Sequence, residues 1–257
     1  MTLLGIDFPP ISHVTRWPDI FFKDTAFGIN KTVLIYFASV LITLLFFFAA
    51  ARKHQLVPRG VQNMAESSVD FVRESVILQT IGPEGMGYLP FLTTMFFFVF
   101  FINIFEILPF IQFPGNARIA VPLFLALLVW FIFNIVGIAK QGFGSYMKSS
   151  LVPPGVPKAI LPLMVFIEFI STFIVRPFSL AIRLFANMLA GHLILVTFAI
   201  LSASIWGAAV YFKIGAAFPF ALLVALTAFE ILVSGLQAFI FTILTGVYIG
   251  LAMHPEH

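Results

Sequence analysis

Long runs of apolar residues alternate with short polar segments along the chain. A helix that crosses a bilayer needs about 20 mostly apolar residues, so each long run is a candidate membrane span. The pattern predicts three such spans, followed by two longer apolar stretches near the C-terminus. The predicted spans are Thr32–Ala51, Phe91–Phe113 and Ile119–Ala139, and the longer stretches cover residues 159–204 and 215–253.

The two C-terminal stretches are longer than one perpendicular crossing requires. At about 1.5 Å per residue, ~45 and ~39 helical residues exceed the thickness of the hydrocarbon core. We expect two long, steeply tilted helices, or a hairpin in one of them. The preceding segment, residues 140–158, contains Gly142, Pro153 and Pro157 and is predicted to be a loop.

Residues 57–78 mix charged and apolar side chains at helical spacing. Arg59, Glu66 and Asp70 alternate with residues such as Ala65 and Val69. This pattern predicts an amphipathic helix at the membrane surface. An ordinary polar connecting helix is the alternative.

The composition supports a membrane protein. Of the 257 residues, 61% are hydrophobic and only 10% are charged, whereas soluble domains carry about 25% charged residues. The fold class is therefore an all-α integral membrane protein with about five crossing helices and one interfacial helix, in a single membrane domain of residues 1–257. Basic residues number seven in loops 52–88 and 140–158 and five on the opposite side. This bias predicts an outside N-terminus and a cytoplasmic C-terminus.

Other observations exclude several functions. The chain has no cysteine, which removes disulfides and thiolate metal sites. No phosphate-binding G-x-x-x-x-G-K-[ST] loop is found, and the net charge of +3 is too small to indicate nucleic-acid binding. We therefore expect no cofactor, no metal and no nucleic-acid partner.

Several ionisable residues lie inside the apolar stretches, where each costs at least a few kcal/mol. With Glu168 at zero on a helical wheel, the polar residues of its stretch fall within an arc of about 100°. With Glu230 at zero, those of the last stretch fall within about 80°. Two polar stripes are therefore predicted, the first of Glu168, Thr172, Arg176, Ser179, Arg183, Asn187 and Thr197, and the second of Thr227, Glu230, Ser234, Gln237, Thr245 and Tyr248.

These residues differ in chemistry. Arg183 cannot lose its proton at physiological pH, so it can only provide a fixed positive charge. Glu230 and His192 can titrate and suit a proton path. Structural roles stay open for Arg176 and Glu168 as ion-pair members, and for Asn103 and Glu106 as a polar contact inside the bundle.

The segment Arg176–His192 resembles subunit a of the F-type ATP synthase. The family pattern is a basic residue and P-x-S-L-x-x-R-L-x-x-N-x-x-A-G, followed by His or Glu, and this sequence matches it. Further matches cover Phe229–Phe241 and Asn103–Pro109. The resemblance extends over nearly the whole chain, including the number and order of spans.

The resemblance implies a role for each matching residue. Arg183 matches the stator arginine that faces the carboxylates of the rotor ring, with Asn187 and Gln237 as its polar neighbours. His192 and Glu230 match a pair along one half-channel, while Asn103 and Glu106 match residues of the other access path. Glu168 lies nine residues before Pro177, where the family has eight, so its equivalence stays open.

The resemblance also implies a function. The chain would be the stator of the membrane sector, conducting protons to and from a ring of proteolipid c subunits without binding nucleotide itself. Peripheral-stalk b subunits, the rest of the complex and membrane lipid would be its other partners, in the inner membrane of a bacterium. Residues 1–27 would form an N-terminal segment, 28–158 three spans with loops, and 159–257 the two long helices of the stator.

Three other classes of protein are compatible with parts of the pattern. A secondary transporter also buries Arg, Glu and His, but internal repeats and broken helices are not found here. An intramembrane hydrolase needs a nucleophile motif such as G-x-S-x-G, which is absent. A purely structural stator would not need two polar stripes.

Overall fold

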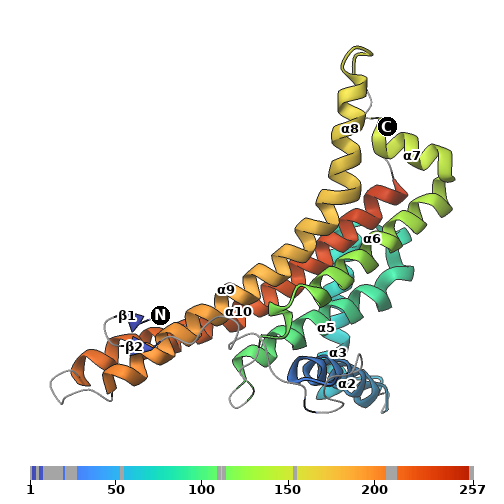
Figure 1. Ribbon diagram of the computed structural model, residues 1–257. Helices are drawn as coiled ribbons and strands as arrows, with labels where there is room; N and C mark the ends of the chain where they lie inside the picture. Colours follow the sequence, from blue (N-terminus) through green and yellow to red (C-terminus); the bar gives the residue numbers. More distant parts are fainter. Residues whose placement is uncertain are drawn as a thin grey trace. The chain divides into compact units, whose positions relative to one another are not determined.

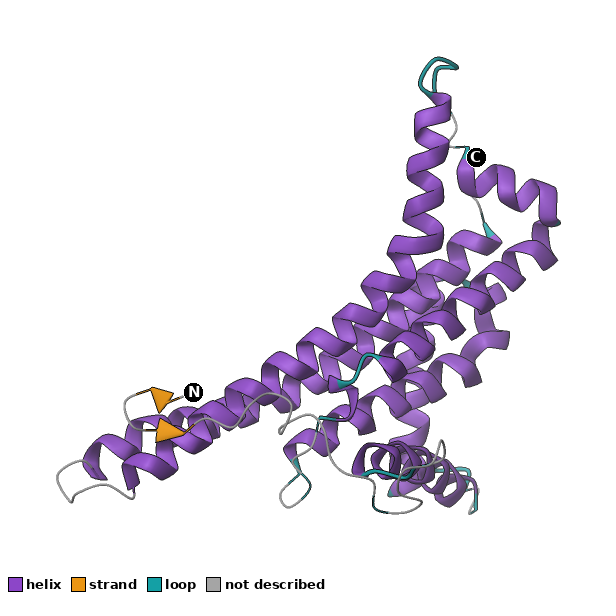
Figure 2. Cartoon of the chain, in the orientation of Figure 1, coloured by secondary structure: helices purple, strands orange, loops and turns teal. Residues whose placement is uncertain are grey.

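The computed structural model describes residues 2–3, 6–7, 20, 28–52, 55–108, 111, 114–152, 155–206 and 213–254. These residues are almost entirely helical (Figure 2). Among them, the strands are limited to β1 (Thr2–Leu3) and β2 (Ile6–Asp7), which pair antiparallel. The predicted all-α class is confirmed.

Five helical stretches among the described residues are long and apolar enough to cross a membrane. The first three are α2 (Lys31–Ala51), α5 (Leu89–Ile107) and α6 (Ala120–Gln141), labelled in Figure 1. They confirm the three shorter predicted spans. The second span was predicted to reach Phe113, but α5 ends at Ile107, shortly before Pro109, since proline disfavours helical backbone in the residue that precedes it.

The two C-terminal stretches are each one continuous helical run. The first comprises α8 (Leu161–Ile170), the π-helical turn η4 (Ser171–Val175) and α9 (Arg176–Trp206), and the second is α10 (Lys213–Met253). They provide apolar spans of 46 and 37 residues. The structure therefore supports two long helices and not a hairpin within either stretch.

The π-helical turn η4 changes the direction and the register of the first long helix. The backbone N–H of Arg176 donates to the carbonyl of Ser171, five residues back, so this turn holds an extra residue. It lies just before Pro177, whose ring would clash with a carbonyl four residues earlier in a regular α-helix. Figure 1 shows the change of direction between α8 and α9.

Because of this turn, the first predicted polar stripe was wrong in part. The helical wheel places Thr172 on the same face as Arg183, but Thr172 is buried and Arg183 is exposed. Residues before the turn are rotated relative to those after it, since one extra residue corresponds to about 100°. The stripe therefore continues only from Arg176, the first residue of α9, onward.

The amphipathic helix predicted at 57–78 is confirmed. It consists of α3 (Val61–Val72), a π-helical turn η1 (Arg73–Ile77) and α4 (Leu78–Thr80), and the 3₁₀ turn η2 (Pro83–Tyr88) follows it. Its buried positions include Ala65 and Val72, whereas the charged residues Glu66 and Asp70 are exposed.

The loop predicted between residues 140 and 158 contains a helix, α7 (Phe143–Leu151), so that prediction was wrong in part. Gly142, with φ of 79°, separates α7 from α6. The Tyr146 ring packs where a side chain at Gly137 would lie, and its hydroxyl donates to Asn134 Oδ1 at 3.1 Å. Burial raises the pKa of Tyr146, which keeps the hydroxyl available as a donor.

The chain divides into two compact units. Unit 1 comprises Met1–Thr43, Phe98–Arg118 and Phe185–Gln237, and unit 2 comprises Leu44–Phe97, Ile119–Leu184 and Ala238–His257. In unit 1, Ile35 of α2 and Phe105 of α5 form a buried cluster. The single membrane domain stays a prediction.

Within unit 2, the C-terminal end of α10 packs closely against the end of the amphipathic helix. A Cβ atom at Gly250 would overlap the carbonyl oxygen of Thr80, and a Cβ at Gly246 would lie 3.2 Å from Val76 Cγ1. Gln141 Nε2 of α6 donates to the carbonyl oxygen of Ala252 at 2.7 Å. The small residues of α10 therefore allow backbone-to-backbone contact here.

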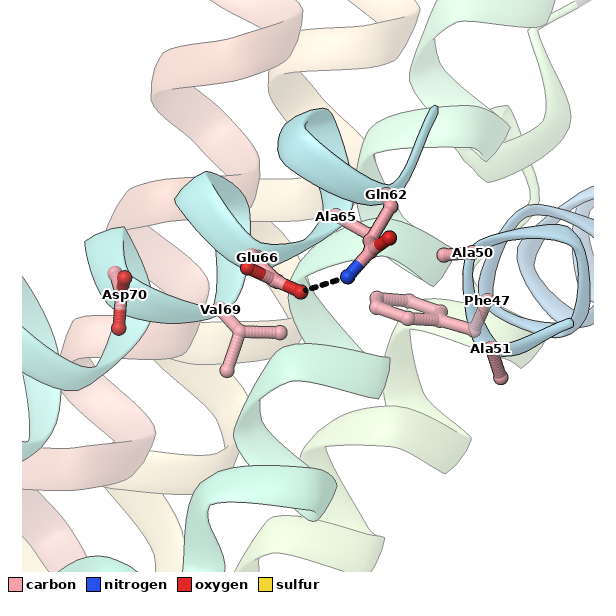
Figure 3. Close-up of a pocket in the computed structure, with 8 residues that line it drawn as sticks. All are labelled: Phe47, Ala50, Ala51, Gln62, Ala65, Glu66, Val69 and Asp70. Carbon is pink, nitrogen blue, oxygen red and sulfur yellow. Dashed lines mark hydrogen bonds between the residues drawn. The ribbon is translucent and has the colours of Figure 1, made fainter. Parts of the chain in front are cut away.

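A hollow of about 360 Å³ lies between the end of α2 and α3 in unit 2. Figure 3 shows Gln62 donating to the carboxylate of Glu66, with Nε2 and Oε1 2.7 Å apart. None of the ionisable residues of the apolar stretches lines it. The lining residues are Phe47, Ala50, Ala51, Gln62, Ala65, Glu66, Val69 and Asp70.

Candidate functional site

Two ionisable residues from different helices meet inside unit 1. His192 Nδ1 of α9 lies 3.4 Å from Glu106 Oε1 of α5. Glu106 is 2% exposed and His192 is 6% exposed. Neither carboxylate oxygen of Glu106 has a hydrogen-bond partner among the described residues. A buried carboxyl group requires hydrogen-bond partners, so Glu106 must either carry a proton or bind an ordered water molecule.

Glu230 of α10 packs against α9 at Gly191, next to His192. A Cβ atom at Gly191 would lie 2.7 Å from Cδ and 2.9 Å from Oε2 of Glu230. Because Gly191 has no side chain, the carboxyl group of Glu230 can occupy this space. Glu230 is itself 8% exposed. The structure brings Glu106, His192 and Glu230 into one region of unit 1, which we call the acid–histidine cluster.

A row of amides continues from this cluster along α5. Asn103 and Glu106 lie three residues apart and share one face of the helix. Asn116, in the 3₁₀ turn η3 (Gly115–Ala117), donates from Nδ2 to Asn103 Oδ1 at 3.0 Å, and both residues are buried. Sequence reasoning missed Asn116, because its contact with Asn103 does not follow from helical spacing. The only local signal is an amide within a Pro-Gly-Asn turn.

The acid–histidine cluster contains residues that the family resemblance assigns to two different access paths. The resemblance assigned Asn103 and Glu106 to a different access path from His192 and Glu230. The distance between Glu106 and His192 instead places these residues in one contiguous polar region. The α5 and α9 side chains meet here, which the spacing of residues within each helix does not reveal.

Arg183 lies on an exposed face of α9. The adjacent apolar residue Ile182 is 37% exposed. Ala186 and Ala190, at helical spacing from Arg183, are small and add little bulk to the helix. A charged group on an exposed helix face flanked by small residues is suited to close contact with another helix.

Asn187 and Gln237 differ in their surroundings. Asn187 follows Arg183 by one turn on α9 and is more accessible than Gln237. Gln237 is 6% exposed, and its Nε2 has no partner among the described residues. Most of the second predicted stripe faces the interior, which is confirmed by the burial of Glu230, Ser234, Gln237 and Thr245.

Arg176 and Glu168 lie in unit 2 and do not form an ion pair with each other. The Arg176 guanidinium lies 5.6 Å from the centre of the Tyr248 ring, which indicates a cation–π contact. The Tyr248 ring in turn lies 5.8 Å from that of Phe133. Within the part of the chain that the structure describes, neither Arg176 nor Glu168 has an oppositely charged group at ion-pair distance.

Known proteins resemble this chain over nearly its whole length. A family model described as ATP synthase A chain matches residues 32–250. ATP synthase subunit a of Rhodococcus erythropolis is 44% identical over 241 residues, covering 93% of this chain and 88% of the relative. The Frankia alni protein of the same name is 45% identical over 252 residues (96% and 86%), and that of Beijerinckia indica is 39% identical over 245 residues (95% and 95%). With its five apolar spans and buried polar residues, this chain therefore belongs to the ATP synthase A chain family.

Proposed function

We propose that the chain is the stator of the membrane sector of ATP synthase and conducts protons to and from a rotating ring of proteolipid subunits. The observation that carries this proposal is Arg183, a permanent cation on an exposed face of the apolar span that contains α9. A buried or lipid-facing charge requires an opposite charge. A membrane carboxylate on a moving partner would supply it, without a lasting ion pair within the chain.

The acid–histidine cluster supplies a proton path on one side of Arg183. Glu106, His192 and Glu230 are titratable, buried and close together. A proton that passes along them reaches a rotor carboxylate, and the neutral carboxyl group then enters the lipid. Each charge that crosses the membrane releases about 2.3 kcal/mol per 100 mV, which the ring converts into rotation.

The second half-channel would lie on the other side of Arg183. On α9, Arg176 lies seven residues before Arg183 and His192 lies nine residues after it. The fixed charge of Arg183 lies between these two residues along the sequence of the helix. It would attract the deprotonated rotor carboxylate and block direct passage of protons from one path to the other.

The remaining assignments follow from the same proposal. Nucleotide chemistry would take place in other chains, and peripheral-stalk subunits would hold this one against the torque of the ring. The bias of basic residues supports an outside N-terminus and a cytoplasmic C-terminus in a bacterial inner membrane.

Cross-linking of the intact complex tests the contact with the ring. Because the chain has no cysteine, Ile182→Cys introduces the only reactive thiol of this subunit. We expect a thiol-directed cross-linker to join the thiol at position 182 to a proteolipid, since Ile182 is exposed beside Arg183. The product is identified by mass spectrometry.

The matched control is Ile135→Cys on α6, since the Ile135 side chain is also exposed, at 62%. It should give no proteolipid adduct. Equal yields at both positions, or no adduct at position 182 in an assembled complex, would contradict the proposed rotor-facing surface.

A further inference from the structure

The turn Gly115–Ala117 is buried although it belongs to a connecting segment. Gly115, Asn116 and Ala117 are all buried. Three side-chain hydrogen bonds hold this part of unit 1 in place. Lys31 Nζ donates to the Ile111 carbonyl at 2.7 Å, Tyr36 Oη to the Gly115 carbonyl at 2.5 Å, and Asn116 Nδ2 to Asn103 Oδ1 at 3.0 Å.

The bond from Asn116 determines the orientation of the Asn103 side chain. An amide has one acceptor oxygen and one donor NH₂ group. Because the Asn103 oxygen accepts from Asn116, the Asn103 NH₂ group is left to donate elsewhere. Glu106 lies one turn along the same helix face, and both of its carboxylate oxygens lack a hydrogen-bond partner among the described residues.

A second unpaired acceptor lies in the same place. Asn116 is 0% exposed, and its Oδ1 has no partner among the described residues. Buried polar atoms that lack protein partners are commonly satisfied by ordered water. The unpaired oxygens of Asn116 and Glu106 flank the fixed Asn103 amide, so this row is suited to hold water that leads to the acid–histidine cluster.

We propose that Asn116 is a positioning residue of the proton path. By donating to Asn103, it keeps the Asn103 NH₂ group directed toward the water that serves Glu106. The turn Gly115–Ala117 thereby forms the end of the polar row that continues through Glu106 and His192. This inference rests on the proposed function of proton conduction.

Asn116→Asp is the most specific test, because the shape of the side chain is almost unchanged. When ionised, a carboxylate at position 116 only accepts hydrogen bonds, so Asn103 must turn over and present its oxygen toward Glu106. Because burial favours the protonated form, which can still donate, flux is compared at neutral and at alkaline pH, and the loss should be larger at alkaline pH. We expect passive proton flux through the membrane sector, measured in vesicles stripped of the soluble head, to fall about fivefold or more, as for the loss of one hydrogen bond. Asn116→Ala should have a similar effect.

Tyr36→Phe provides the matched control. It removes the hydrogen bond to the Gly115 carbonyl but leaves Asn116 bonded to Asn103. We expect its flux to stay within about twofold of the wild type. If Tyr36→Phe lowers flux as much as Asn116→Asp, the turn has only a structural role and the positioning role is overturned.

A double-mutant cycle tests whether Asn116 acts through Asn103. The double variant Asn103→Ala with Asn116→Asp should conduct no more slowly than Asn103→Ala alone, because the residue that Asn116 orients is then gone. Effects that multiply would overturn the proposal. Assembly is checked by subunit stoichiometry, and the isosteric Asn116→Asp carries the test if Asn116→Ala assembles poorly.

Glu230→Gln, measured in the same vesicles, separates this inference from the function on which it rests. If Glu230→Gln slows flux while all Asn116 variants conduct as the wild type does, only the role of Asn116 is wrong. If Glu230→Gln also conducts at the wild-type rate, the proposed proton path itself fails.

Discussion

Replacing Arg183 by alanine is expected to abolish ATP-driven proton pumping while the complex still assembles. The side chain is exposed on α9, so its removal leaves no cavity in the packing of the chain. In the proposed function, its loss removes the fixed charge that holds a deprotonated rotor carboxylate. Arg183→Lys should fail largely as well, because lysine can lose its proton in a low-dielectric environment. The measurement is acidification of inverted membrane vesicles after addition of ATP.

Arg73→Ala is the matched control for removal of a positive charge. Arg73 forms exposed ion pairs with Asp70 and Glu74 at 3.3 and 3.2 Å. Such surface pairs contribute about 0–1 kcal/mol, so pumping should be unchanged. Normal pumping by a well-assembled Arg183→Ala complex would contradict the stator assignment.

Gly250→Leu is expected to have the second large effect, on folding and assembly. Even a Cβ atom at this position would overlap the Thr80 carbonyl oxygen and lie 3.1 Å from the Thr80 carbonyl carbon. Backbone atoms cannot rotate away as a side chain can, so α10 would have to separate from the amphipathic helix. Overpacking of this kind typically costs about 1–3 kcal/mol or more. The amount of the chain in purified complex should fall severalfold, as measured by quantitative immunoblotting.

Gly144→Leu on α7 is the comparison for this substitution. A Cβ atom at Gly144 would meet nothing within 4 Å, so the complex should form at nearly the wild-type level. If Gly250→Leu assembles as well as Gly144→Leu does, the close packing of α10 against Thr80 does not hold in the complex.

The membrane spans could be predicted from sequence because the bilayer imposes a simple length requirement. About 20 apolar residues are needed for a crossing, and α2, α5 and α6 each coincide with a long apolar run. The second polar stripe could also be predicted, since α10 is regular from Glu230 to Tyr248. Its most polar members are indeed buried.

The first stripe could not be predicted fully, because the helical wheel assumes a constant number of residues per turn. The extra residue in η4 rotates Glu168 and Thr172 away from the face of Arg183. Pro177 indicates a disturbance of the helix but not its geometry. Only the backbone shows that the disturbance is a π-helical turn.

Contacts between helices were beyond prediction from one sequence. The pairing of Glu106 with His192 joins residues 86 positions apart, and no periodicity within α5 or α9 reveals it. The same holds for Asn116, which reaches Asn103 through a turn. The sequence leaves open an ion-pair role for Arg176, whereas in the structure its guanidinium lies over the face of the Tyr248 ring.

The most direct test of the central claim is passive proton flux in vesicles that contain this chain, the proteolipid ring, or both. A potassium diffusion potential drives the flux, and a pH-sensitive dye inside the vesicles records it. We predict rapid flux only when both are present, because in the proposed function each path ends at a rotor carboxylate beside Arg183. Flux through this chain alone at the same rate would contradict the stator role and would favour a secondary transporter.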